Sequence, residues 1–388
     1  MLRIAIVGTG NISSAHIKSY LAFPERCQIA AFVDTVPEAA RKRAEQLGLN
    51  VELLDSHKQL LGRDDIDLVS VCTPPFSHAE IAIDLLNDGK HVLVEKPMAP
   101  SLEECDRMIE AAKRSGKVLS IVAQNRFLDP IMNLKRVLDS GLIGRVVHAQ
   151  IDSHWWRGHC YYDLWWRGRW STEGGGCTLN HAVHHIDMLG WMMGLPTKVA
   201  ALLSNASHDN AEIEDISVAA LQYDGGRVAQ VTSSVIHHGE EQQVIFQGEN
   251  ARISAPWKVY ASTSKDNGFP QRNEALEEEL QKYYEGLPPL AHTGHQGQID
   301  DVLAAIETGG TPLITGESGR MTIELITAIY KAGFEQRTVE LPIAKDDLYY
   351  TAQGLVDNAP HFYEKTNSVA HLGSGQEISV GGNYRDRK

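Results

Sequence analysis

The stretch Glu95-Lys-Pro97 combines residue types whose chemistry and spacing suit a reacting group. It follows Val92-Leu-Val94, an apolar run with β-branched residues that predicts a buried strand. Glu95 and Lys96 would stand at the end of this strand, where open parallel sheets bind their ligands. Pro97 restricts the backbone of Lys96 to extended conformations, and a lysine held there can orient a substrate oxygen. From these residues alone, a solvated charge pair before a turn proline is an equally good interpretation.

A histidine-rich stretch supplies the second candidate, His184. We expect one long helix over residues 177–193, on which Asn180, His184 and Asp187 share a stripe. A histidine held between an amide and a carboxylate can take the proton from a substrate alcohol as its hydride leaves.

Two other roles are open for this stretch. A metal site would draw its ligands from His181, His184, His185 and Asp187, but residues 184 and 185 diverge on a helix and the HExxH pattern is absent. We therefore expect no metal. A structural histidine is the other alternative, and it suits His181 and His185 better than His184.

Most of the tryptophans are crowded into residues 155–170, a segment that also carries tyrosine and arginine. Aromatic faces stack on the apolar faces of sugars and cyclitols, while arginine and tyrosine bond their hydroxyl groups. The alternative is that these rings pack an interdomain or subunit interface. The expected substrate contacts are Lys96, Arg157, Tyr161, Trp165, Arg169, Asn180 and His184.

The N-terminus carries a dinucleotide fingerprint in its strand–turn–helix context. Residues 3–7 predict a strand, Gly8 allows a tight turn, and Gly10 lets a pyrophosphate approach the next helix. Ser13 replaces the third glycine of the pattern. Asp34 ends the second predicted strand, where an acid accepts hydrogen bonds from the adenosine ribose and repels a 2′-phosphate. We therefore expect NAD as the cofactor, in preference to NADP.

Further cofactor contacts are expected where the later strands end. The turn at residues 73–78 would lie beside the nicotinamide. His78 there either contacts the ligand or merely opens the following helix. The expected cofactor-binding residues are Gly8, Gly10, Asn11, Ile12, Asp34, Thr73, Pro74, His78, Glu95, Lys96 and Asn125.

The elements that must position these residues fall into two groups. Strands alternate with helices as far as residue 123, which predicts an α/β Rossmann domain with a doubly wound parallel sheet over residues 1–123. Successive strand patterns then predict an α+β domain over residues 124–345 with a large open, mostly antiparallel sheet. Residues 260–289 are expected to be irregular. Residues 346–388 form a C-terminal extension whose tail we expect to be partly disordered or an exchanged arm.

Composition excludes several classes of function. The net charge of −14 argues against a nucleic-acid surface or an anionic membrane as partner. No apolar stretch approaches a membrane-spanning length, and no signal-peptide pattern opens the chain. The five cysteines lack CxxC spacing, so we expect reduced thiols in a cytoplasmic protein.

Several motifs, in order over nearly the whole chain to about residue 342, resemble the glucose–fructose oxidoreductase / inositol dehydrogenase (Gfo/Idh/MocA) family. The pairing of EKP with GGG…HxxD is the most specific of them. The matching pieces are Gly8-Thr-Gly10, Asp34, Cys72-Thr-Pro-Pro75, Glu95-Lys-Pro97, Gly141-Leu-Ile-Gly144, Gly174-Gly-Gly176, and His184 with Asp187, followed by weaker matches at Glu214-Asp215 and Gly316-Glu-Ser-Gly-Arg320.

The resemblance implies an N-terminal Rossmann domain, a C-terminal domain with an open sheet, and homodimers or homotetramers formed through that sheet. It also implies a catalytic pair, carried here by Lys96 and His184. Many relatives have an aspartate one helical turn before the histidine, where this chain has Asn180. An amide cannot raise the basicity of the histidine, so a proton relay through that aspartate does not transfer.

Together, the residues and the resemblance predict an NAD-dependent dehydrogenase that oxidises a secondary hydroxyl of a sugar, sugar derivative or cyclitol. One alternative is a glycoside hydrolase or lyase that keeps NAD bound and uses it transiently. Another is a non-catalytic nucleotide-binding sensor, which would need neither Lys96 nor His184.

Overall fold

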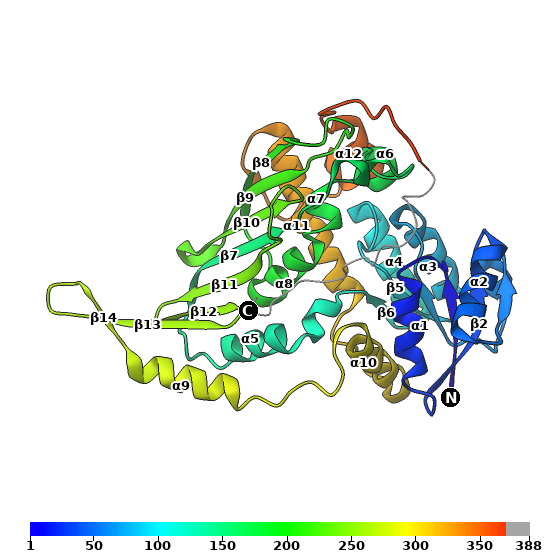
Figure 1. The fold of residues 1–388 in the computed structure, drawn as a ribbon, viewed down its shortest axis with the longest axis horizontal. Helices are drawn as coiled ribbons and strands as arrows, with labels where there is room; N and C mark the ends of the chain where they lie inside the picture. Colours follow the sequence, from blue (N-terminus) through cyan, green and yellow to red (C-terminus); the bar gives the residue numbers. More distant parts are fainter. Residues whose placement is uncertain (370–388) are drawn as a thin grey trace. The chain divides into compact units, whose positions relative to one another are not determined.

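A computed structural model describes residues 1–369, shown in Figure 1. The chain divides into two compact units: residues 1–127 with 291–323, and residues 128–290 with the chain from 324 onward. We predicted a disordered or exchanged tail, and its residues 370–388 lie outside the described part of the chain.

The first unit is built on a parallel sheet of six strands in the order β3-β2-β1-β4-β5-β6, which confirms the predicted α/β class. Helices connect the strands, as parallel pairing requires. The strands are β1 (Leu2–Val7), β2 (Cys27–Val33), β3 (Glu52–Leu54), β4 (Leu68–Val71), β5 (His91–Val94) and β6 (Leu119–Ile121). The helices between them are α1 (Ser13–Leu21), α2 (Pro37–Leu47), α3 (His78–Asn87) and α4 (Leu102–Ser115).

Local sequence explains where these helices begin and end, and α4 is an example. The Ser101 hydroxyl accepts a hydrogen bond from the Glu104 backbone N–H, and Gly116 ends the helix with a φ of 65°. Leu102, Cys105 and Met108 recur at helical spacing and are all fully buried, so α4 covers one face of the sheet with an apolar stripe.

A later helix belongs to this first unit as well. Ile299, Val302 and Leu303 of α10 (Gly294–Thr308) join the apolar core formed by β1, β2 and α1. Residues 291–323, which we placed in the second domain, therefore pack with the first unit. The predicted boundaries after residues 123 and 345 otherwise stay predictions.

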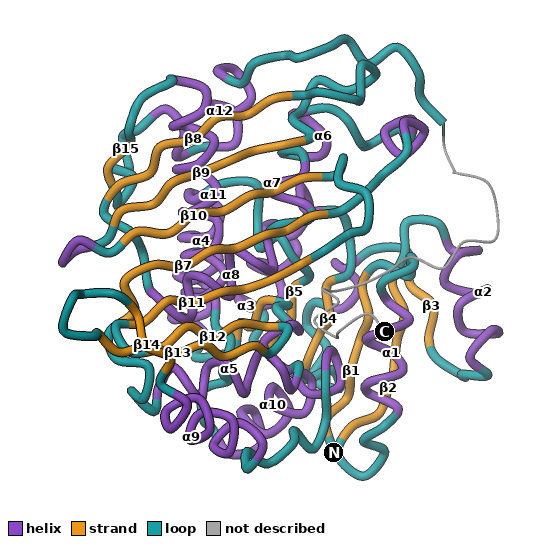
Figure 2. Tube along the Cα trace, turned by 60° about the vertical axis from the view of Figure 1, so that its left-hand side comes forward, coloured by secondary structure: helices purple, strands orange, loops and turns teal. Residues whose placement is uncertain are grey.

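The second unit contains a nine-stranded sheet in the order β14-β13-β12-β11-β7-β10-β9-β8-β15, with its strands side by side in Figure 2. Neighbouring strands are antiparallel except β7 and β10, which confirms the mostly antiparallel sheet. Its strands are β7 (Val146–His154), β8 (Lys198–Ser204), β9 (Ile216–Gln222), β10 (Val228–Ser234), β11 (Gln242–Gly248), β12 (Ala251–Ala255), β13 (Lys258–Ser264), β14 (Pro270–Arg272) and β15 (Val339–Glu340).

Helices of the second unit pack against this sheet, with α7 on β9 and β10, α8 on β7, and α5 on β12. The strand register places Leu202, Val218, Val228 and Tyr260 on the sheet's other face, and all four are exposed. The helices are α5 (Asp129–Asp139), α6 (Trp170–Glu173), α7 (Cys177–Asn180), α8 (Val183–Met193), α9 (Glu274–Glu285), α11 (Gly316–Glu335), which enters from the first unit, and α12 (Ala352–Asn358).

Two predictions about this unit were wrong. Residues 260–289 are not irregular, because they contain β13, β14 and α9. Helix α9 begins at the Asn273 side chain, which accepts the Leu276 backbone N–H at 3.2 Å, but Leu280 is its only fully buried apolar residue. An apolar face this narrow gives too weak a periodic signal to identify the helix.

The second error is the long helix predicted over residues 177–193, which breaks into α7 and α8 at His181 and Ala182. A distant carboxylate holds the start of the first of these two helices. Glu214 accepts the backbone N–H groups of Gly176 and Thr178, both at 3.0 Å, and thereby caps the start of α7. A Cβ on Gly176 would lie 1.9 Å from the Glu214 carbonyl oxygen, so this close contact requires glycine.

Among residues 1–369, none of the helices has both the length and the apolar character needed to cross a membrane.

Replacing Glu214 should therefore weaken the fold. Burial raises its pKa to about 7, and at pH 8 the carboxylate accepts from Gly176, Thr178 and the Tyr330 hydroxyl. Glu214→Gln turns an N–H donor toward these donors, and we expect a loss of about 1–3 kcal/mol in the free energy of unfolding. Urea denaturation at pH 8 measures it. Glu212→Gln is the control, and equal stability of the two variants would contradict the capping role.

Candidate active site

The turn after β1 is shaped by Gly8. Its φ is +89°, and a Cβ there would lie 2.8 Å from the carbonyl carbon and oxygen of Cys72. A larger residue would therefore push the turn away from the end of β4. Glycine at this position keeps the β1–α1 turn tight.

The start of α1 is open to a ligand. A Cβ at Gly10 would meet no atom within 4 Å, and no side chain caps the helix at Ile12. Within residues 1–369, the backbone N–H groups of Asn11 and Ile12 donate to no other group. Open space, free amides and the positive end of a helix dipole fit the pyrophosphate of a dinucleotide.

Asp34 follows β2 and faces this turn. One carboxylate oxygen accepts the Thr9 backbone N–H at 2.8 Å and the Thr9 hydroxyl at 2.6 Å, and the other accepts the Val36 N–H at 2.9 Å. These bonds fix the acid beside the glycine turn. Arg43, which we did not select from the sequence, also reaches the turn and donates to the Gly10 carbonyl at 3.0 Å.

The turn after β5 holds Lys96 between two buried groups. One Glu95 carboxylate oxygen accepts the Lys96 backbone N–H at 3.1 Å, and the other lies 2.9 Å from His16 Nε2. On the far side, the ring nitrogens of His78 lie 2.8 Å from the Thr73 carbonyl and 2.9 Å from that of Pro97. The His78 ring is fully buried, so its geometry is that of a brace between two loops. These bonds support the helix-opening alternative, and a cofactor contact at His78 stays a prediction.

Asn125 lies in a short 3-10 turn, Gln124–Phe127, after β6. It is buried, yet neither atom of its amide has a hydrogen-bond partner among the described residues. A buried amide without partners is costly unless a ligand or water completes it. This is the kind of donor and acceptor that a bound cofactor or substrate would satisfy.

In the second unit, His184 is the second residue of α8 and is buried, as is Asp187 almost one turn later. Asn180 belongs to the separate helix α7 and donates to the Gly175 carbonyl at 2.7 Å, so the stripe expected on one helix is wrong for this residue. Burial lowers the pKa of the neighbouring His185 to about 3. A neutral, fully enclosed imidazole supports a structural role for His185.

Two of the expected substrate-binding residues lie together. The Tyr161 hydroxyl is 3.3 Å from His181 Nε2, and the guanidinium of Arg157 lies 5.7 Å from the centre of the Tyr161 ring. Arg167, which we did not predict, lies only 4.1 Å from that centre and pairs with the buried Glu173 at 2.7 Å. Two arginines, a tyrosine and a histidine thus form one cluster in the second unit.

Trp165 and Arg169 lie on the part of this segment that contacts the C-terminal chain. The Trp165 side chain is exposed, and its backbone N–H donates to the Val369 carbonyl at 2.9 Å. Arg169 lies 3.9 Å from Glu212. Other rings of the segment are core residues, since Trp170 is buried and packs edge-on against Tyr330. The segment therefore serves packing as well as an exposed surface.

Two histidines near Lys96 were missed as site residues. His16 of α1 and His295 of α10 both approach Glu95. From the sequence, two roles are equally good for His295: reaching the pocket, or opening the helix that follows. Nothing in the local sequence links it to a glutamate 200 positions earlier, because the contact depends on how α10 packs.

The two glycines of the turn should respond differently to alanine. Gly8→Ala combines a positive φ with contact against the Cys72 backbone, so we expect it to lower the free energy of unfolding by about 1–3 kcal/mol. Gly10→Ala meets nothing in the free protein and should keep its stability while binding of NAD weakens. Urea unfolding and NAD titration by fluorescence measure both. Unchanged NAD affinity in Gly10→Ala would contradict the assignment of the pyrophosphate to this turn.

Comparison with known proteins identifies the family. Residues 2–123 match the model described as "Oxidoreductase family, NAD-binding Rossmann fold", and residues 135–341 match "Oxidoreductase family, C-terminal alpha/beta domain" of the same GFO_IDH_MocA family. The 2,7-anhydro-N-acetylneuraminate hydratase of Mediterraneibacter gnavus is 27% identical, over 87% of this chain and 96% of its own. The myo-inositol 2-dehydrogenase of Thermotoga maritima is 26% identical, over 88% and 98%.

Solved structures agree with this. The WlbA dehydrogenase from Bordetella pertussis, in complex with NADH and UDP-GlcNAcA, is similar with a TM-score of 0.75 and 26% identity, over 88% of this chain and 98% of that one. The chain belongs to the Gfo/Idh/MocA oxidoreductase family, and its N-terminal region is an NAD-binding Rossmann domain.

Proposed function

We propose that this protein is an NAD-dependent dehydrogenase that oxidises a secondary hydroxyl of a sugar, sugar derivative or cyclitol. The observation that carries the proposal is the turn at Lys96, fixed at the same edge of the parallel sheet as the open glycine turn after β1. Two similar proteins support this substrate class: one is named myo-inositol 2-dehydrogenase, and the other is the WlbA dehydrogenase in complex with NADH and UDP-GlcNAcA.

Each residue of the proposed site has its own chemical role. NAD, when bound, supplies the acceptor for a hydride from the substrate carbon. His184 removes the proton of the same hydroxyl, and Lys96 donates a hydrogen bond to its oxygen and stabilises the developing negative charge. Arg157 and Tyr161 hydrogen-bond other hydroxyls of the substrate. Trp165, Arg169 and Asn180 remain proposals for further contacts.

Asp34 carries the preference for NAD. Its carboxylate is fixed beside the glycine turn by Thr9 and Val36, where it can accept hydrogen bonds from the adenosine ribose. A 2′-phosphate would meet this negative charge, so we propose NAD in preference to NADP.

We further propose that the protein forms homodimers or homotetramers through the open face of its nine-stranded sheet and acts in the cytoplasm. The exposed apolar residues Leu202, Val218, Val228 and Tyr260, which share that face, support the association.

A second candidate function is favoured by one relative. The M. gnavus protein is named a hydratase of an anhydro sugar, and hydration involves no net oxidation. Residues that serve a dehydrogenase would also serve an enzyme that keeps NAD bound and uses it transiently. Net release of NADH separates the two.

The first test is absorbance at the NADH band when pure protein is mixed with NAD or NADP and a panel of inositols, aldoses and glycosides. We expect a signal with NAD and one class of substrate. A signal with NADP alone would contradict the role of Asp34. No signal, together with cofactor bound to the purified protein, would favour the hydratase or lyase.

A second test separates chemistry from binding. Lys96→Ala should lower kcat by about 10²–10⁴-fold, because the developing charge loses its donor, and should leave the Kd for NAD within about threefold. Lys113→Ala removes an exposed lysine of α4 that pairs with Glu317 and serves as the matched control. Equal losses of turnover and NAD affinity in Lys96→Ala would contradict the proposed role.

A further inference from the structure

We propose that His16 and His295 are positioning residues for Lys96: they hold one oxygen of the Glu95 carboxylate, so that the other oxygen fixes the Lys96 backbone. The catalytic consequence rests on the function proposed above for Lys96, whereas the positioning itself does not.

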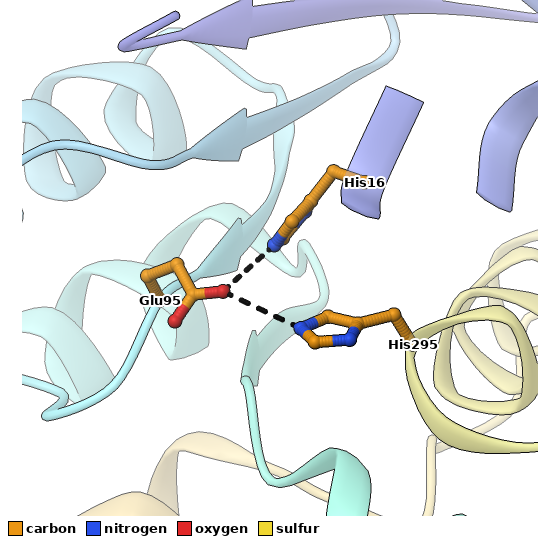
Figure 3. A group of neighbouring side chains, drawn as sticks. All are labelled: His16, Glu95 and His295. Carbon is orange, nitrogen blue, oxygen red and sulfur yellow. Dashed lines mark hydrogen bonds and ion pairs between the residues drawn. The ribbon is translucent and has the colours of Figure 1, made fainter. Parts of the chain in front are cut away.

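The three side chains come from distant parts of the first unit. Figure 3 shows His16 and His295 approaching the same Glu95 oxygen, His16 Nε2 at 2.9 Å and His295 Nε2 at 3.7 Å. The opposite oxygen of Glu95 accepts the Lys96 N–H at 3.1 Å. One carboxylate thus links α1 and α10 to the turn after β5.

The histidine on α1 cannot easily swing away from this carboxylate. His16 is fully buried, and its other ring nitrogen lies 3.2 Å from the Ser70 hydroxyl, which in turn lies 2.7 Å from the Tyr20 hydroxyl. This chain of polar contacts fixes the plane of the His16 ring and with it the direction of its bond to Glu95.

The charge state agrees with this arrangement. Burial opposes ionisation of Glu95, but the hydrogen bond from His16 and the approach of His295 outweigh it, so the pKa of Glu95 lies well below its usual value. Burial lowers the pKa of His16 and keeps that ring neutral. Glu95 is then a carboxylate that accepts hydrogen bonds at both oxygens.

Lys96 is consequently held from both sides. Glu95 fixes its amide, and the buried His78 bridges the carbonyls of Thr73 and Pro97 on the far side. A catalytic ammonium must reach the substrate oxygen with an error well below about 1 Å, since a misplacement of that size costs about 10²-fold in rate. A loosened Glu95 would therefore reduce turnover without removing any group that touches the substrate.

The same three groups could instead bind a metal ion, because their ligating atoms lie within 4.8 Å of one another. We favour the positioning role over a metal site because both Glu95 oxygens are already engaged. One oxygen lies within hydrogen-bond distance of His16, and the other accepts the Lys96 amide N–H. Metal content therefore forms one arm of the test.

The test uses His295, whose side chain is less buried than that of His16. His295→Leu removes the polar contact, and His295→Gln restores a nitrogen donor in a similar position. The matched control is His292→Leu, which alters a histidine just before α10 that packs edge-on against Phe23. Each variant of the full-length protein is measured for kcat, KM, Kd for NAD, urea midpoint, zinc content and hydrogen exchange of the peptide over residues 92–98.

We expect His295→Leu to speed exchange of the Lys96 amide about tenfold and to lower kcat about tenfold or more, with the Kd for NAD within about threefold. His295→Gln should recover most of both effects, and His292→Leu should show neither. Recovery by glutamine is the result that a merely structural role would not produce.

Unchanged amide exchange in His295→Leu would overturn the proposal, as would faster exchange with unchanged kcat. One equivalent of zinc in the wild-type protein that is lost in His295→Leu would overturn it in favour of a metal site. If the wild-type protein oxidises nothing, the proposed function fails, and the exchange measurement still decides whether His295 positions Lys96.

Discussion

The parallel pairing of β1, β4 and β5 is the constraint on which the cofactor half of the site depends. Because paired parallel strands end at the same edge of a sheet, the turns at Gly8, Thr73 and Lys96 are brought together. The chain at Gly8 lies so close to Cys72 that a Cβ at this position would clash with the Cys72 backbone. The open helix start and the lysine turn are both consequences of this shared edge.

Three buried carboxylates hold turns and a helix start in place. Glu95 joins two helices to the lysine turn, Glu214 caps the start of α7, and Glu173 pairs with Arg167 beside Tyr161. Each lies in an environment where an unpaired charge would be costly, and each is surrounded by N–H or O–H donors. The protein uses such groups to fix turns whose sequences carry no strong local preference, at the places where candidate site residues lie.

The second unit also depends on buried polar contacts, but it is built around a mostly antiparallel sheet. Its sheet is covered on one face by α5, α7 and α8, and the break between α7 and α8 separates Asn180 from His184. The family's aspartate would stand at residue 180, but here an asparagine turns back to bond the Gly175 carbonyl.

The sequence by itself determined the alternation of strands and helices in the first unit, the tight turn at Gly8, the acid at Asp34 and the family to which the chain belongs. These features are local: they follow from periodicity, from cap residues such as Ser101 and from glycine where φ is positive. Only the tertiary structure decided the break in residues 177–193, the packing of α10 with the first unit, and the meeting of His16, Glu95 and His295. The start of α7 is capped by Glu214, which comes from a distant part of the chain, and the triad joins His16 to His295, 279 positions later in the sequence. Contacts between side chains so far apart in the sequence leave no local pattern. Neither the spacing of apolar residues nor the turn residues indicate which distant side chain a residue will contact.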